Sequence, residues 1–335
     1  MKNYFNHTVY FKNTPYVIGH YSVAGKKEGM GNFKEYFDEV IEDDLLGEKS
    51  YEKAESEMLK KLFKKATLDA NLNYSDIDAV VMGDLLNQIT SSSFCARELD
   101  SAYIGIYGAC STMAESLLIG SMLIDGGYMS NVACGTCSHF SSSEKQYRFP
   151  LELGNQRPLM AQWTVTGGGM SVLSEKKSKI KIRCGTFGKV EDYGVKDANN
   201  MGSAMAPAAY STLKTHFFNT RTSPNDYDLI VTGDLGKLGS DILRDLMSKT
   251  NYPLGRNYHD AGAMIFSKNQ HVMQGGSGAG ASASFLNGYI FKKMEKGEYK
   301  KVLFVATGAL LSPLTTLQKE SIPSVAHAVV FEYEE

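Results

Sequence analysis

Short apolar runs alternate along the chain with longer segments in which apolar residues recur every three or four positions. The clearest segment with helical spacing runs from Tyr51 to Ala70 and follows Ser50, a residue type that favours helix N-termini. The polar segments 24–50 and 140–160 contain Gly or Pro and are predicted to be loops that cover a pocket. Strands that alternate with helices predict an α/β fold whose strands are mostly parallel. Apolar runs of strand length occupy residues 76–85, 103–107, 131–136, 164–173, 226–235, 301–308 and 326–332.

One part of this pattern occurs twice. Asp76–Leu85 reads DIDAVVMGDL and Asp226–Leu235 reads DYDLIVTGDL, so six of ten positions are identical at an offset of 150 residues. Each copy is a short apolar run that ends in Gly-Asp. Self-similarity of this kind indicates a duplicated architecture.

A second pair of segments supports the duplication. Gly108–Thr112 (GACST) begins a helical run to about residue 124, and Gly276–Ser282 (GSGAGAS) begins another to about residue 294, each followed by a strand. We therefore predict two similar halves whose boundary lies between Leu173 and Ile182. This divides the chain into residues 1–175 and 176–335.

Composition and charge narrow the class of protein. Hydrophobic residues make up 43% and charged residues 21%, which is typical of a globular protein and excludes a disordered one. Lys and Arg (35) nearly balance Asp and Glu (37), so we expect no nucleic-acid partner. No window approaches the roughly 18 to 20 apolar residues that span a bilayer, and the first residues lack the apolar core of a secretory signal.

The five cysteines are an odd number, which predicts reduced thiols rather than a disulfide framework. We therefore expect a soluble or peripheral protein in a reducing compartment. Cys134 and Cys137 form a C-x-x-C on an apolar strand, where structural packing is the better interpretation.

Cys110 is the first candidate for chemistry. It lies between a predicted strand and a predicted helix, and Gly108-Ala109 permits a sharp turn before it. A thiol at a helix N-terminus experiences the positive end of the helix dipole, which favours thiolate. Alternatively, Cys110 is a small core residue.

The segments around Cys110 resemble a known superfamily. They are Tyr107–Thr112, Val132–Thr136, Thr166–Gly169 and Gly276–Ser282, and together they are similar to the thiolase superfamily, which includes thiolases and ketoacyl-ACP synthases. The resemblance covers nearly the whole chain. It implies a thiolase-like fold with two pseudo-symmetric βαβαβαββ halves and five layers, α-β-α-β-α, in agreement with the repeat.

Further motifs, spread in order along the chain, carry a closer resemblance. They are Gly108–Met113, Asp125–Gly127, Ser138–His139, Glu144–Pro150, Met201–Ala208, Gly308–Pro313 and Ile322–His327. Together they resemble a family within this superfamily, the stage V sporulation AD proteins of spore-forming Firmicutes. The resemblance implies binding of dipicolinic acid, alone or as its calcium chelate, and a part in its uptake into the developing spore and its release in germination. It also implies a peripheral location at the spore inner membrane with other stage V sporulation A proteins, and it allows a homodimer.

The chain departs from the condensing enzymes that it resembles. These enzymes pair the cysteine with a histidine after the first strand of the second half, and with an asparagine or histidine in the Gly-rich turn. Here the two positions fall at Thr232-Gly233-Asp234 and at Ser277, and neither supplies an imidazole. An Asp234 carboxylate beside Cys110 would disfavour the thiolate. We therefore interpret Cys110 as a vestigial nucleophile in a binding site, with no catalytic residue.

Dipicolinate is a flat aromatic dianion, so its site needs hydrogen-bond donors or cations and a flat contact. We expect no cofactor and no resident metal. Trp163 could stack on the ring or be an ordinary buried anchor, and the basic loop residues could instead be solvated. The predicted ligand-binding residues are Cys110, Ser111, Thr136, Ser138, His139, Arg148, Trp163, Asp234, Ser277 and Gly308.

Two other functions stay open. The chain could be an acyltransferase or condensing enzyme that uses Cys110 on an acyl-CoA or acyl carrier protein, with His139 as an unusual base. It could also be a purely structural scaffold with no ligand.

Overall fold

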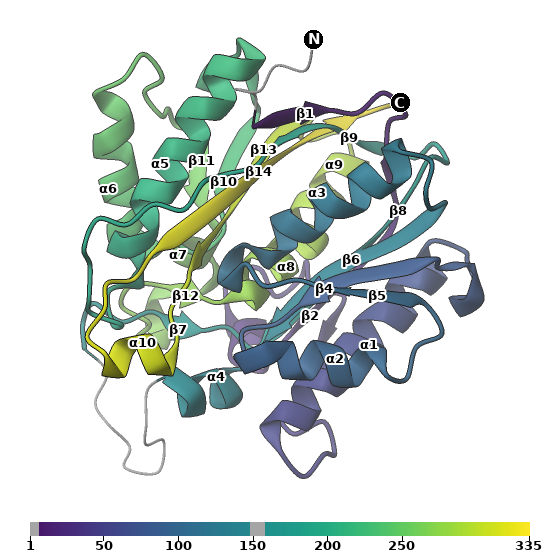
Figure 1. Ribbon diagram of the computed structural model, residues 1–335, viewed down its shortest axis with the longest axis horizontal. Helices are drawn as coiled ribbons and strands as arrows, with labels where there is room; N and C mark the ends of the chain where they lie inside the picture. The colour runs from purple at the N-terminus through teal and green to yellow at the C-terminus, as the bar shows by residue number, and fades with distance from the viewer. Residues whose placement is uncertain (1–6, 148–157) are drawn as a thin grey trace.

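The computed structural model describes residues 7–147 and 158–335, and its layers follow the order α-β-α-β-α (Figure 1). In the first half the strands lie in the order β2-β8-β6-β4-β5, and in the second half in the order β9-β14-β13-β10-β11. The first set is β2 (Tyr16–Ala24), β4 (Ala79–Gly83), β5 (Ala102–Gly105), β6 (Asn131–Ser138) and β8 (Gly167–Ser174). The second set is β9 (Ile180–Thr186), β10 (Leu229–Thr232), β11 (Tyr258–Asp260), β13 (Lys301–Ala309) and β14 (Ser324–Tyr333).

Strand directions repeat along with strand order. β4 is parallel to β5 and β6, while β8 is antiparallel to β6 and β2. In the second half β10 is parallel to β11 and β13, while β14 is antiparallel to β13 and β9. The α/β fold with two pseudo-symmetric halves is thus confirmed, and the predicted division at residue 175 falls between β8 and β9.

The two halves meet along β2 and β9, where Tyr16 pairs with Lys181 and Val17 with Ile180. Two short strands extend this region, because β1 (Thr8–Tyr10) pairs with β9 and β3 (Glu39–Val40) pairs with β2. A separate parallel pair, β7 (Trp163–Thr164) and β12 (Gly276–Ser277), also joins the halves. It lies next to the candidate site described below.

Helices cover both faces of each sheet. The middle layer consists of α3 (Thr112–Asp125) and a continuous helical run of α8 (Ala279–Phe285), a π-helical turn (Leu286–Ile290) and α9 (Phe291–Glu295). α1 (Tyr51–Asp69) and α2 (Thr90–Ala96) cover the first half, and α5 (Met201–Thr220) and α6 (Gly236–Ser248) cover the second (Figure 1). The shorter helices are α4 (Phe140–Tyr147), α7 (Ala261–Ile265) and α10 (Pro313–Leu317).

Neighbouring residues of the central strands point into different cores, as the two-residue period of a strand requires. Val81 and Phe304 lie in the core between the sheets. Val80 packs in the core under α1, and Leu303 packs in the core under α5. Because both faces are buried, these strands are continuous apolar runs, which is why the sequence pattern reveals them.

The prediction of a loop over 140–160 is wrong for its first part, where α4 forms. Its residues are polar, and two of its polar groups bond to buried partners: the Phe140 N–H donates to Thr166 Oγ1, and Ser142 Oγ donates to Glu55 Oε2 at 2.7 Å. The sequence pattern also does not predict α5, which contains Pro207. None of the helices over the described ranges combines the length and apolar character needed to cross a bilayer.

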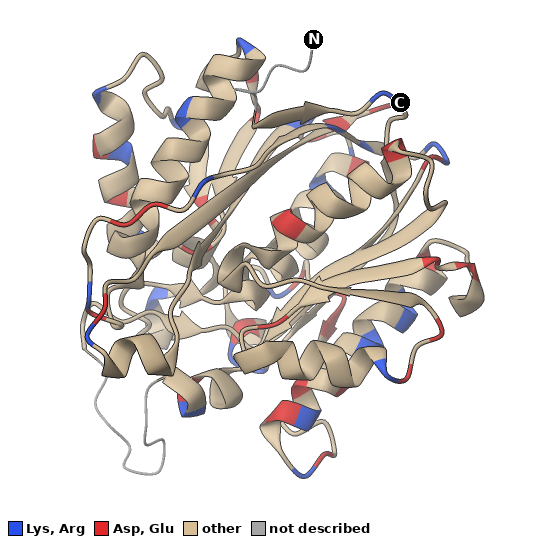
Figure 2. Ribbon diagram, viewed as in Figure 1, with Lys and Arg blue, Asp and Glu red and all other residues tan. Residues whose placement is uncertain are grey.

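Residues 24–50 consist mainly of turns, as expected, and they connect the two halves. The Asn32 side chain donates to the carbonyls of Met264 and Phe266, and Gln270 donates to the carbonyl of Lys27. Acidic and basic side chains lie mainly on outer helices and loops, with both signs mixed (Figure 2). The chain thus shows no single-sign stripe in this view.

Gly308 of β13 lies directly against the backbone carbonyl of Gly108, in the turn that precedes Cys110, so a Cβ at this position would overlap that carbonyl. We expect Gly308→Ala to lower the free energy of unfolding by about 1–3 kcal/mol, the usual effect of overpacking. Urea unfolding measures this. Gly255→Ala is the matched control, because its Cβ would meet only a side-chain atom of Asn257, and it should change stability by about 0.5 kcal/mol or less. Equal effects of the two substitutions would contradict the close contact.

Glu28 is a buried carboxyl that accepts the Thr166 N–H, and burial raises its pKa to about 8. Between about pH 4.5 and 8 the folded chain therefore holds a proton that the unfolded chain releases, so this group makes stability fall as pH rises. Glu28→Gln removes this dependence. Between about pH 4.5 and 8, the unfolding free energy of the variant should therefore rise relative to that of the wild type by up to about 1.4 kcal/mol per pH unit. Unfolding free energies at pH 5, 6, 7 and 8 test this, and parallel curves for the two proteins would show that Glu28 does not titrate as described.

Candidate functional site

Two strand-to-helix turns face each other between the sheets. The first precedes α3 and carries Cys110, and the second precedes α8 and carries Ser277 and Gly278. Each turn contains a residue with left-handed backbone, Ala109 (φ 50°) and Gly278 (φ 100°). For Ala109 this conformation is unfavourable, and such backbone strain is often found at functional sites.

Asp234 follows β10, and its buried side chain binds the turn before α8. Its carboxylate accepts hydrogen bonds from the Gly278 N–H (2.8 Å), Thr307 Oγ1 (2.9 Å) and Ser277 Oγ (3.3 Å). The Cys110 thiol lies close enough to feel the charge of this carboxylate. One buried carboxylate therefore joins β10 to the start of α8 and to β13, beside Cys110.

These contacts determine the charge of the thiol. Burial raises the pKa of the Cys110 thiol well above its usual range, and the adjacent Asp234 carboxylate raises it further. Burial also raises the pKa of Asp234 to about 6, against the lowering effect of its hydrogen bonds, so near pH 7 most of it is ionised. Burial and the Asp234 carboxylate thus favour a neutral Cys110 thiol, in the direction that the sequence predicts for Asp234.

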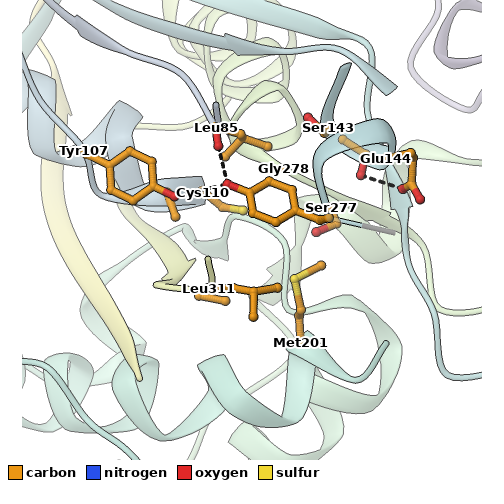
Figure 3. A pocket seen from close by; sticks show the side chains of 13 residues that line it. Leu85, Tyr107, Cys110, Ser143, Glu144, Met201, Ser277, Gly278 and Leu311 are labelled. Carbon is orange, nitrogen blue, oxygen red and sulfur yellow. Dashed lines mark hydrogen bonds between the residues drawn. The ribbon is translucent and has the colours of Figure 1, made fainter. Parts of the chain in front are cut away.

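A pocket lies above Cys110 (Figure 3), and its walls are mostly apolar and aromatic. The centre of a water molecule can occupy about 40 Å³ of it. The lining residues are Leu85, Tyr107, Ala109, Cys110, Ser143, Glu144, Tyr147, Thr164, Met201, Ser277, Gly278, Ala309 and Leu311. Among them Glu144 is the charged residue, and it accepts a hydrogen bond from Thr164 Oγ1 at 3.0 Å.

Tyr107 and Tyr147 bring their hydroxyl groups together at 3.3 Å, and the Tyr147 hydroxyl also donates to the backbone carbonyl of Leu85. Tyr147 ends α4, whereas Leu85 follows β4, so this contact connects two segments that are distant in sequence. Across residues 7–147 and 158–335, no cluster of three or more His, Cys, Asp or Glu is placed to hold a metal ion.

The structure brings together Cys110, Ser277 and Asp234 of the predicted site residues. Three other predicted hydroxyl residues lie elsewhere and bond to backbone instead. Ser111 Oγ donates to the Gly108 carbonyl, Thr136 Oγ1 to the Gly83 carbonyl, and Ser138 Oγ to the Val165 carbonyl. These side chains are fully buried and do not line the pocket.

His139 is also outside the pocket. Its Nε2 contacts the Asp44 carbonyl at 2.8 Å and its Nδ1 accepts the Ser141 N–H, so both ring nitrogens are occupied. Burial lowers the pKa of His139. The histidine therefore holds the start of α4 and is not placed to act on Cys110.

Trp163 stacks on Phe140 with ring centroids 4.0 Å apart, and Lys27 lies over its ring, which fits the interpretation as a packing anchor. Gly308 contributes close packing rather than an identified N–H donor. Arg148 lies outside the described residues.

The predicted site residues, chosen mainly for their polar side chains, do not include the aromatic and apolar walls of the pocket, chiefly Tyr107, Tyr147, Met201 and Leu311. Each of these four residues nevertheless lies within a motif that carries the family resemblance. Motif membership, rather than polarity, was the signal that could have found them.

Solved structures of several enzymes share this fold. The chain is similar to 3-oxoacyl-[acyl-carrier-protein] synthase III from Aquifex aeolicus VF5, with a TM-score of 0.58, 14% identity and coverage of 95% of this chain and 100% of that one. It is also similar to human mitochondrial 3-ketoacyl-CoA thiolase in complex with CoA (TM-score 0.60, 12% identity, 96% and 98% covered). A Bacillus anthracis acetyl-CoA acetyltransferase gives a TM-score of 0.61 at 11% identity, with 97% and 100% covered. At these identities the likeness shows the thiolase-like fold alone.

Comparison with known sequences identifies the family, which structural similarity alone does not. The chain is 41% identical over 322 residues to "Stage V sporulation protein AD" of Bacillus subtilis (strain 168), which covers 96% of this chain and 95% of that protein. The profile of the same family, stage V sporulation protein AD, matches residues 5–332. The chain therefore belongs to the stage V sporulation protein AD family, and it has a thiolase-like fold.

Proposed function

We propose that this sporulation protein binds dipicolinate, alone or as its calcium chelate, in the pocket above Cys110 and catalyses no reaction there. In this proposal it takes part in moving dipicolinate into the developing spore and out of it in germination, beside membrane partners of the stage V sporulation A system. The ligand comes from the family resemblance, and the site comes from the structure.

The observation that carries the proposal is the Asp234 carboxylate against the Cys110 thiol. Condensation on a cysteine needs a thiolate and donors for an oxyanion. At Cys110 burial and the Asp234 carboxylate oppose ionisation, and they outweigh the Gly278 N–H and Ser277, which favour it. A neutral thiol can still donate a hydrogen bond to a ligand, so the site retains binding chemistry.

The lining of the pocket favours an aromatic ligand. Tyr107 and Tyr147 supply aromatic surface, while Met201 and Leu311 supply apolar contact. Aromatic rings pair favourably in stacked or edge-to-face arrangements. The Ser277 and Thr164 hydroxyls donate to Asp234 and Glu144, so a ligand carboxylate would have to replace one of these bonds, whereas the Glu144 carboxylate could face the cation of a calcium chelate.

Calorimetric titration of dipicolinate into the protein, with and without calcium, tests the proposal. We expect saturable binding that Cys110→Ala weakens about 5- to 100-fold, the range that corresponds to losing about 1–3 kcal/mol at a buried polar contact. Cys184→Ala is the matched control, because it also removes a buried thiol but on β9, away from the pocket. It should leave the affinity unchanged.

Two results would contradict the proposal. One is no heat of binding to the wild-type protein at millimolar ligand, and the other is equal affinity of the wild type and Cys110→Ala. The acyltransferase alternative requires an acylated Cys110 thiol. Incubation with acyl-CoA followed by mass spectrometry of the Cys110 peptide tests for this adduct.

Asp234→Asn should make the Cys110 thiol more reactive, because it removes the adjacent negative charge. We expect the pH profile of iodoacetamide labelling at Cys110 to move to lower pH, with about tenfold more labelling at a given pH for each unit by which the thiol pKa falls. Labelling of Cys184 and Cys95 in the same sample reports general loosening and should not change. If the Cys110 profile keeps its position, Asp234 is not what holds the thiol neutral.

A further inference from the structure

The turn after β4 has an unfavourable backbone. Gln88 (φ 58°) and Ile89 (φ 46°) are consecutive residues in the left-handed region, which side chains with a Cβ rarely adopt and β-branched ones least of all. Such a conformation persists only where other contacts hold it.

The turn has bonds of its own, from the Ile89 N–H to the Leu86 carbonyl and from the Leu86 N–H to Asp84, and the last turn of α4 adds contacts to the residues just before the strained pair. Tyr147 Oη and Gln146 Nε2 (3.3 Å) both donate to the Leu85 carbonyl, and the Asn87 N–H donates to Gln146 Oε1 at 3.0 Å. We call these residues, Leu85, Asn87, Gln146 and Tyr147, the latch. Tyr107 Oη contacts Tyr147 Oη from the other side of the pocket.

The latch lies over Cys110. Leu85 and Tyr147 line the pocket together with the thiol, whereas Asn87 and Gln146 do not line it. The pocket offers about 40 Å³, but a protein cavity that accommodates benzene has about 150 Å³. Dipicolinate carries two carboxyl groups on a ring of that size, so the pocket in this structure does not have the room to enclose it.

We propose that the latch is the element that opens to admit the ligand: the Leu85–Ile89 turn separates from Gln146 and Tyr147, and the space above Cys110 widens. The strained backbone of Gln88 and Ile89 favours opening, and the hydrogen bonds to Leu85 and Asn87 oppose it. The identity of the ligand rests on the proposed function, but the opening itself does not.

Opening can be measured without any ligand, through the rate at which iodoacetamide labels Cys110. Tyr147→Phe removes one hydrogen bond to the Leu85 carbonyl and keeps the ring, and Gln146→Ala breaks the other two contacts without altering the pocket wall. Each should raise the labelling rate about 2- to 10-fold, the change in an equilibrium constant that one or two neutral hydrogen bonds produce. The increase should be uniform across pH, because the charge next to Cys110 is unchanged.

Tyr299→Phe is the control. Tyr299 and Tyr289 form a hydroxyl pair at 3.0 Å like that of Tyr107 and Tyr147, but they do not line the pocket. This variant should label at the wild-type rate. If Tyr147→Phe and Gln146→Ala also label at the wild-type rate, the latch does not control access and the inference is wrong.

Stopped-flow measurement of dipicolinate binding tests the latch and the proposed ligand independently. Faster labelling together with a 2- to 10-fold faster association of dipicolinate and an unchanged dissociation rate would support both. Faster labelling in a protein that binds no dipicolinate would support the latch and overturn the ligand. Faster association without faster labelling would overturn the latch, because the two readouts depend on the same opening.

Discussion

The buried carboxylate of Asp234 is the interaction on which the centre of this protein depends. It joins the end of β10 to the turn before α8 and to Thr307 on β13, beside the Cys110 thiol. A carboxylate in such a place is costly unless it accepts hydrogen bonds, and here Gly278 N–H, Ser277 Oγ and Thr307 Oγ1 donate to it. The two strand-to-helix turns therefore have a fixed relation to each other, and the thiol between them is fixed as well.

The same carboxylate bears on what the site can do. The chain shares its overall fold with a 3-oxoacyl-[acyl-carrier-protein] synthase and a 3-ketoacyl-CoA thiolase. At Cys110 burial and the Asp234 carboxylate favour the protonated thiol, whereas condensation on a cysteine requires the ionised one. Function thus depends on the site more than on the fold.

The repeat, most strands and the middle helices could be predicted from the sequence, because strands buried on both faces are continuous apolar runs. The pairing of Cys110 with Asp234 could be predicted through the family resemblance. The pocket could not be predicted in the same way. The hydroxyls of Thr136 and Ser138 donate to buried backbone carbonyls rather than to a ligand. Tyr147 belongs to a helix whose polar sequence is typical of a loop, and its buried partners Glu55 and Thr166 are distant in sequence.

The small size of the closed pocket has a consequence for how quickly the protein can load. If a ring-sized ligand binds here as proposed, side chains move before it enters, and every binding event includes a rearrangement of the protein. When ligand is scarce, the rate of loading would follow its concentration. When ligand is abundant, the rate would reach a ceiling set by the protein's own motion, and adding more ligand would no longer accelerate it.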